Sequence, residues 1–85
     1  MDFSDLIALK IKELMQEKNM SIYKLEELSG VYTSTITMFL NRKTQTIRLE
    51  NLLYICEGLG ISLSDFFADK RFASVEATEW LKRKK

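Results

Sequence analysis

The amino-acid sequence predicts an all-α fold, and three observations carry this prediction. The chain of 85 residues contains no proline and only three glycines, so few positions interrupt a helix. Apolar residues recur every three or four positions, as in "DFSDLIALKIKELMQEKN". Later segments open with an apolar residue that is followed five positions on by another, which is the spacing of a hydrophobic staple at a helix N-terminus.

A first helix is predicted from about Ser4 to about Lys18. Its apolar side consists of Phe3, Ile7, Ile11 and Leu14. Four staples then predict helices over about 22–29, 33–41, 49–58 and 63–68. The staple pairs are Met20/Leu25, Val31/Ile36, Ile47/Leu52 and Ile61/Phe66, and the residues at the N-caps are Ser21, Tyr32, Arg48 and Ser62. Serine is a good N-cap, whereas tyrosine and arginine are poor ones, so at those two helices Thr33, Thr46 or water takes this role.

One core is expected, because all these helices have an apolar side. Its predicted members beyond the first helix are Ile22, Leu25, Leu28, Ile36, Phe39, Leu40, Leu49, Leu52, Leu53, Ile55, Leu59, Leu63, Phe66 and Phe67. Gly30 and Gly60 are expected to end the second and fourth helices, because glycine takes positive φ at no steric cost.

The pattern weakens after Phe67, so we divide the chain into a domain over 1–68 and a C-terminal extension over 69–85. The extension can hold one more helix from about Ser74, with Val75 or Phe72, Trp80 and Leu81 on its apolar side. A short helix does not persist alone in water, so this one must dock on its own domain or on a partner. Four of the chain's 13 basic residues form its end, as "KRKK".

Composition excludes several classes of function. The chain has one cysteine and no histidine, which excludes an internal disulfide, imidazole catalysis and the usual zinc sites. Its hydroxyls and thiol lack an imidazole base, and no glycine-rich phosphate loop is present, so we expect no enzyme. Cys56 lies in the apolar run "LLYICEGL" and is expected to be a buried, inert thiol. No cofactor, metal or small-molecule ligand is inferred.

The chain contains no run of about 20 apolar residues, and its first residues, "MDFSDL", carry acids where a secretory signal carries basic residues. We therefore expect a cytoplasmic protein that does not enter a membrane. The net charge is only +1, so any surface that binds nucleic acid must concentrate its positive charge locally.

The segments 22–29 and 33–41, joined at Gly30, form a helix, a short turn and a helix, which is a helix-turn-helix unit. Val31, Ile36 and Phe39 hold the second of these helices from the inside. The residues assigned to its outer side are Thr33, Ser34, Thr35, Thr37 and Met38. Short hydroxyl side chains can contact phosphates and base edges, and threonine methyls can pack on thymine methyls.

The segments "IKELMQEKNMS", "KLEELSGVYTSTITMFL" and "LENLLYICEGLGISLSDFF" resemble the phage-repressor-type (Cro/repressor, or XRE) helix-turn-helix domains. The resemblance covers about Leu6 to Phe67 and is strongest to a compact branch of Gram-positive bacteria and their mobile elements. It implies a five-helix lambda-repressor-like domain that binds double-stranded DNA as a homodimer, with the third helix in the major groove. It also implies transcriptional regulation, most often repression. Where relatives usually have glycine after this helix, the chain has Arg42.

The candidate DNA-binding residues follow from the helix-turn-helix unit and from this resemblance. They are Thr33, Ser34, Thr35, Thr37 and Met38 on the third helix, Asn41, Arg42 and Lys43 after it, and Lys24 in the second helix. Thr33, Ser34 and Thr37 are expected to share the outer face, with Thr35 turned toward the first helices. The alternative for the hydroxyls is a solvated helix face, and the alternative for Met38 is partial packing.

A second function is compatible with the sequence: an antitoxin-like or other protein-interaction module with weak DNA binding. The near-neutral charge favours it, and the acidic pair Glu26 and Glu27, expected to be solvated, could repel DNA. A positive stripe along the third helix and residues 41–45 would favour DNA instead.

Overall fold

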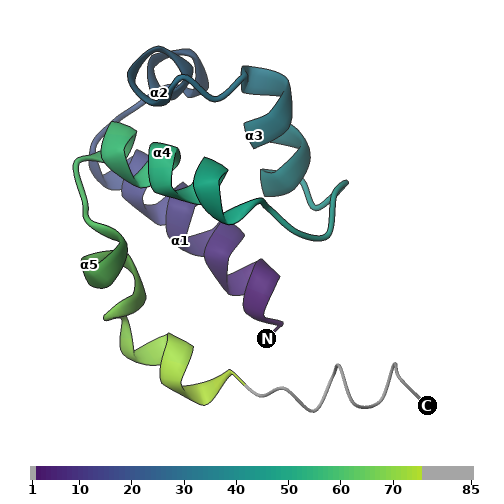
Figure 1. Cartoon of the computed structure of the whole chain (residues 1–85), viewed down its shortest axis with the longest axis vertical. Helices are drawn as coiled ribbons and strands as arrows, with labels where there is room; N and C mark the ends of the chain where they lie inside the picture. Colours follow the sequence, from purple (N-terminus) through teal and green to yellow (C-terminus); the bar gives the residue numbers. More distant parts are fainter. Residues whose placement is uncertain (1, 76–85) are drawn as a thin grey trace.

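The computed structural model describes residues 2–75. These residues form five α-helices and one 3-10 helix (Figure 1), which are α1 (Phe3–Glu17), α2 (Ile22–Ser29), α3 (Thr33–Leu40), α4 (Leu49–Leu59), α5 (Leu63–Phe67) and η1 (Lys70–Ser74). The five predicted helices are confirmed, and no helix end differs from the prediction by more than one residue. None of these helices is both long and apolar enough to cross a bilayer.

The local signals that predicted the helix ends work as expected. The hydroxyl of Ser21 accepts a hydrogen bond from the backbone N–H of Lys24 (3.1 Å), and that of Ser62 accepts one from Asp65 (3.0 Å). Gly30 ends α2 with φ of 77°, and its N–H donates to the carbonyl of Glu26 (2.8 Å). A residue with a Cβ would be strained at this φ, so Gly30 sets the sharp turn between α2 and α3.

Helix α2 packs across α4, and α3 packs against α2 and α1 (Figure 1). Gly58 allows the close approach of α2 and α4, because a Cβ there would lie 3.1 Å from both Leu25 Cδ1 and Ser29 Cβ. The core that these helices enclose comprises Ile7, Ala8, Ile11, Leu14, Leu25, Val31, Ile36, Phe39, Leu40, Leu52, Ile55, Cys56, Leu59 and Phe66. Ile22, Leu63 and Phe67 pack on it while partly buried.

Three predicted core residues beyond α1 are instead exposed, as is Phe3 (46%) from the apolar side predicted for the first helix. Leu28 keeps 48% of its surface exposed, Leu49 67% and Leu53 37%. Leu49 and Leu53 lie four positions apart on one side of α4, and this side is turned away from the row of Leu52, Ile55 and Leu59 that faces the core. The apolar stripe of α4 is thus wider than the surface that the other described helices cover.

Residues 69–74 fold back on α1. The ring of Phe72 joins those of Phe3, Phe66 and Phe67, with centroid distances of 6.0, 5.8 and 5.0 Å. Asp69 caps η1 by accepting a hydrogen bond from the backbone N–H of Arg71 (2.9 Å). Sequence reasoning did not predict η1, although Asp69 is a good N-cap. The helix predicted from about Ser74, with Trp80 and the basic end, lies outside the described residues except for Ser74 and Val75.

Candidate DNA interface

Helix α3 has a clear inner and outer side. Ile36, Phe39 and Leu40 are 0%, 1% and 7% exposed and fix the helix to the core. On the outer side Ser34 and Met38 are exposed, and Thr37 is half-buried. Asn41 follows as the exposed C-cap. Successive residues of a helix turn by 100°, so Ser34, Met38 and Asn41 form one outward row.

Two threonines differ from the prediction. The hydroxyl oxygen of Thr33 is buried and has no hydrogen-bond partner among the described residues, so it does not share the outer face with Ser34 and Thr37. The cause is helical spacing, because Thr33 lies three and seven positions before the buried Ile36 and Leu40. Thr35 turns toward the start of α4 rather than toward the first helices.

The N-terminus of α3 is capped by a residue of another helix. Glu26 of α2 accepts a hydrogen bond from the backbone N–H of Thr33 through Oε2 (2.6 Å). Tyr32, the residue at the N-cap, forms no side-chain cap, and Thr33 does not take the role either. Glu26 is therefore half-buried rather than solvated as expected, while Glu27 is exposed. A phosphate approaching this helix end would meet a carboxylate already bound to the first free N–H.

The loop that follows α3 is organised by Arg42. Its φ of 61° is in the left-handed region, which residues other than glycine rarely adopt. Its guanidinium donates to Asp5 Oδ1 (2.7 Å) and to three backbone carbonyls, those of Phe39, Thr44 and Gln45, at 3.1–3.4 Å. It also lies 4.9 Å from the centre of the Phe39 ring. These contacts stabilise the loop, so most donors of Arg42 are already engaged within the chain.

Other cations beside α3 are open to solvent. Lys43 is exposed, and its ammonium group forms no ion pair with the described residues. Lys24 and Arg48 form only long, exposed pairs with Glu27 and Glu50, each at 3.4 Å. Sequence reasoning missed Arg48 because it considered this residue only as a poor cap. Its position just after the basic residues Arg42 and Lys43 was the feature of the sequence that could have indicated a phosphate contact.

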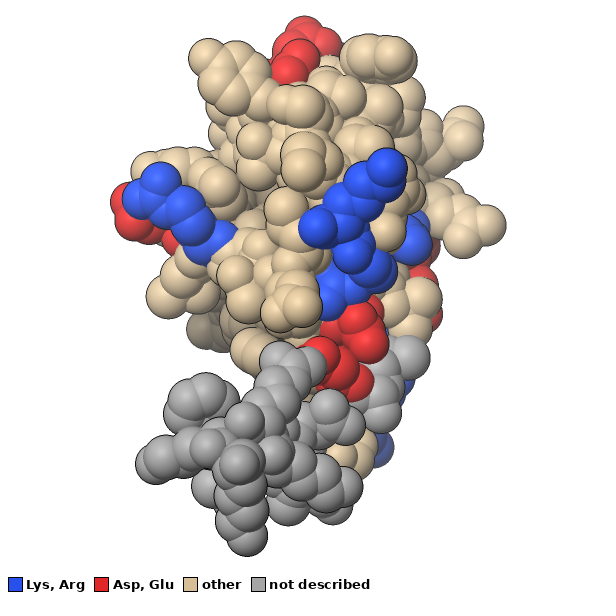
Figure 2. Space-filling model, turned by 90° about the vertical axis from the view of Figure 1, so that its right-hand side faces the viewer, with Lys and Arg blue, Asp and Glu red and all other residues tan. Residues whose placement is uncertain are grey.

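Figure 2 shows the side of the molecule that carries α3 and the following loop. Lys and Arg side chains project from this face mainly in two places, at its left edge and just right of its middle, with uncharged surface between them, and acidic side chains lie above, beside and below them. The positive charge is thus local, as expected, but it does not form a continuous stripe.

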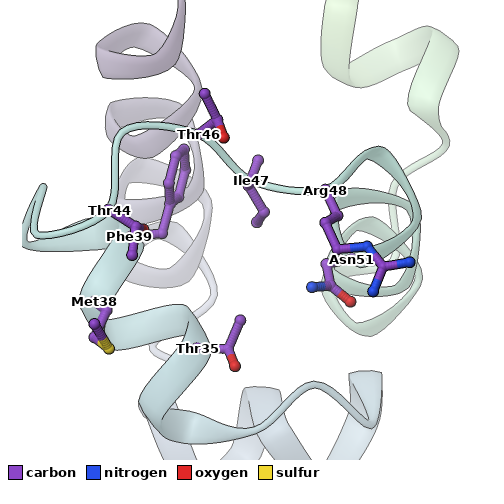
Figure 3. A pocket seen from close by; sticks show the side chains of 8 residues that line it. All are labelled: Thr35, Met38, Phe39, Thr44, Thr46, Ile47, Arg48 and Asn51. Atoms are coloured by element: carbon purple, nitrogen blue, oxygen red, sulfur yellow. The ribbon is translucent and has the colours of Figure 1, made fainter.

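A groove of about 330 Å³ lies between α3, the following loop and the start of α4. Thr35, Met38 and Thr44 approach it from one side and Arg48 and Asn51 from the other, with Ile47 between them (Figure 3). Phe39 and Thr46 complete the lining. Sequence reasoning missed Asn51, because no local pattern indicated that it would face α3.

Cys56 is buried as expected, and burial raises the pKa of its thiol to about 11 because an apolar environment disfavours the thiolate. Within residues 2–75, no three His, Cys, Asp or Glu side chains come together in a way that could hold a metal ion.

Comparison with known proteins agrees with this geometry. The family model of the Cro/C1-type HTH DNA-binding domain matches residues 10–70, which include the whole helix-turn-helix unit and the loop after it. Neither the curated proteins nor the solved structures include a match to this chain. Since the family model covers most of its length, the chain belongs to the family of Cro/C1-type helix-turn-helix DNA-binding domains.

Proposed function

We propose that this DNA-binding domain is a sequence-specific transcriptional repressor that inserts α3 into the major groove. The observation that carries this proposal is the division of α3 into a buried inner side and an outer side free of carboxylates. A helix held from one side can enter the groove, which is about 12 Å wide, without unfolding the domain. A domain bound across a promoter excludes the polymerase by occupying its site.

The exposed side chains divide into two groups. Ser34, Thr37, Met38 and Asn41 face outward and would contact base edges. Lys43, Arg48 and Lys24 have free or weakly paired cations and would contact phosphates, which position the protein without specifying sequence. Arg42 would act on DNA indirectly, by holding the loop that carries Lys43.

We further propose that the protein binds as a homodimer. One α3 offers only a few short side chains to a half-site, so a single copy makes few base contacts. Two copies on half-sites about 34 Å apart would double these contacts. Binding of the first copy would also hold the second near its half-site, which raises the overall affinity.

The test is a selection of bound sequences from random duplex DNA, followed by titration of the best duplex at several salt concentrations. We expect a two-fold symmetric motif, and an association constant that falls with salt because each neutralised phosphate releases counterions, with a logarithmic slope of about −0.9 per phosphate. An affinity that is independent of salt, with no enriched motif, would contradict the proposal.

A second candidate function is binding to another protein, which the exposed apolar side chains of Leu49, Leu53 and Tyr54 on α4 favour. These residues lie on a helix whose role in the first proposal is limited to Arg48 at its N-cap. Replacement of Leu53 by Asp separates the two functions, because it should abolish protein binding while the DNA affinity of each monomer is kept.

A further inference from the structure

Helix α3 lacks the side chains that make the strongest base contacts. Its residues "TSTITMFL" include no Arg, Lys, Asn, Gln, Asp or Glu. Bidentate contacts to guanine come from Arg or Lys, and those to adenine come from Asn or Gln, so α3 can form neither. The first amide appears only at Asn41, the C-cap. Base discrimination by the helix itself must therefore use single hydroxyls or apolar contacts.

The apolar contacts of the outer side concentrate at one position. Met38 is the largest side chain of the outward row, and 43% of its surface is exposed. Thr35, one turn earlier, lines the same groove, and its methyl group points into the groove while its hydroxyl points away (Figure 3). Phe39 and Ile47 make the interior of this groove apolar as well.

The major-groove edge of the base pairs offers one apolar group, the 5-methyl of thymine. We propose that Met38 and the Thr35 methyl group form a contact for this methyl, so that each half-site requires a thymine at one position. This inference rests on the proposed function and adds the base that α3 selects. Adenine, guanine and cytosine carry no methyl group at the corresponding edge, so none of them would bury the exposed thioether as well.

The expected size of the effect follows from the apolar surface involved. Burial of one methyl group at this site should strengthen binding about fourfold. That preference is modest for one base pair, but a homodimer would apply it in both half-sites, which gives roughly 16-fold if the two contacts are independent.

Deoxyuridine is the probe that isolates this contact, since it differs from thymidine only by the missing methyl. We would take the best duplex from the random selection and replace its thymines one at a time by deoxyuridine. Fluorescence anisotropy would then measure the dissociation constant for the wild type and for Met38→Ala, Met38→Leu, Thr35→Ser and Thr37→Ser. Circular dichroism would check that each variant melts like the wild type.

We expect one thymine per half-site at which deoxyuridine weakens wild-type binding about fourfold. This loss should vanish in Met38→Ala and persist in Met38→Leu, which keeps an apolar side chain of similar size. Thr35→Ser removes only a methyl and should reduce the loss. Thr37 does not line the groove, and serine keeps the hydroxyl by which Thr37 would contact a base edge, so Thr37→Ser is the matched control and should leave the deoxyuridine loss at this thymine unchanged.

Two results would overturn the inference while leaving the proposed function intact. One is tight, salt-dependent binding in which no deoxyuridine replacement matters. The other is a deoxyuridine effect of equal size in the wild type and in Met38→Ala, together with an equal loss of affinity of Met38→Ala for all duplexes. That pattern would mean that Met38 contacts the sugar and not the thymine methyl. Failure to bind any duplex would instead refute the proposed function itself.

Discussion

The region around η1 and the surface around α3 use charged residues in opposite ways. On the side of η1, Arg71 donates to both Glu13 and Asp69 at 2.6 Å, and Lys10 pairs with Asp69 at 3.0 Å. On the side of α3, Lys43, Lys24 and Arg48 are exposed and are unpaired or paired only at 3.4 Å. The first side uses its charges to fasten the chain, and the second leaves them available to a partner.

Two residues on the α3 side do not follow this division. Arg42 and Glu26 lie beside the proposed interface, yet both are engaged in internal hydrogen bonds, with Asp5 and with the N–H of Thr33. The comparison therefore predicts that substitutions of these two residues act first on stability, whereas substitutions of their exposed neighbours act on DNA binding.

The largest effect is expected for Arg42→Ala. It removes a charged donor from four acceptors and should lower the free energy of unfolding by about 2 kcal/mol, measured by urea denaturation. Arg42→Gly should lose less of the free energy of unfolding than Arg42→Ala does, because glycine adopts the φ of 61° without strain. Lys43→Ala is the matched control, with stability unchanged and a salt slope reduced by about one. If Arg42→Ala left stability unchanged and reduced only the salt slope, Arg42 would be a phosphate ligand instead.

A smaller effect is expected for Glu26→Ala. Loss of the cap on α3 should cost about 1 kcal/mol of stability, visible as a lower thermal midpoint. The same change removes a negative charge from the N-terminus of α3, so DNA affinity at low salt should rise. Glu27→Ala serves as the control, since its carboxylate is exposed and caps nothing. Equal stability losses in both variants would show that the cap is unimportant.

The smallest effect is expected from acid on the η1 side. Hydrogen bonds from Arg71 are the main reason that the pKa values of Asp69 and Glu13 lie below their ordinary range in the folded chain. Such carboxylates stabilise the fold fully above their unfolded pKa of about 4, and the stabilisation is lost as pH falls through the lower folded values. Thermal midpoints measured from neutral to acid pH should therefore converge between the wild type and Arg71→Ala. A constant difference at all pH values would contradict this account.

Local signals in the sequence predicted what is local in the fold. Ser21 and Ser62 cap helices through neighbours three positions away, and Gly30 ends α2, so these features could be located without a structure. Apart from the local cap of η1 at Asp69, the contacts that sequence reasoning missed join distant positions. Glu26 caps Thr33 seven positions on, and Arg42 reaches Asp5 across 37 positions.

The candidate site was predictable to a lesser degree for the same reason. Helical spacing alone placed Ser34 and Met38 on the outer side. The same spacing puts Thr33 on the side of the buried Ile36 and Leu40, so the burial of its hydroxyl was also predictable. The groove with Asn51 arises only when α4 packs beside α3, so no single segment encodes it. Periodicity also wrongly assigned Leu49 and Leu53 to the core. It shows how wide the apolar side of α4 is, but not how much of that side the neighbouring helices cover.

The split character of α3 bears on how such a regulator can change its target. Ser34 and Met38 make no hydrogen bond or ion pair within residues 2–75 through their side chains, while the anchoring of the helix depends on Ile36, Phe39 and Leu40. Under the proposed function, substitutions at the outward positions would therefore alter operator preference with little effect on folding. A variant library restricted to those positions would be a practical route to retargeting this scaffold.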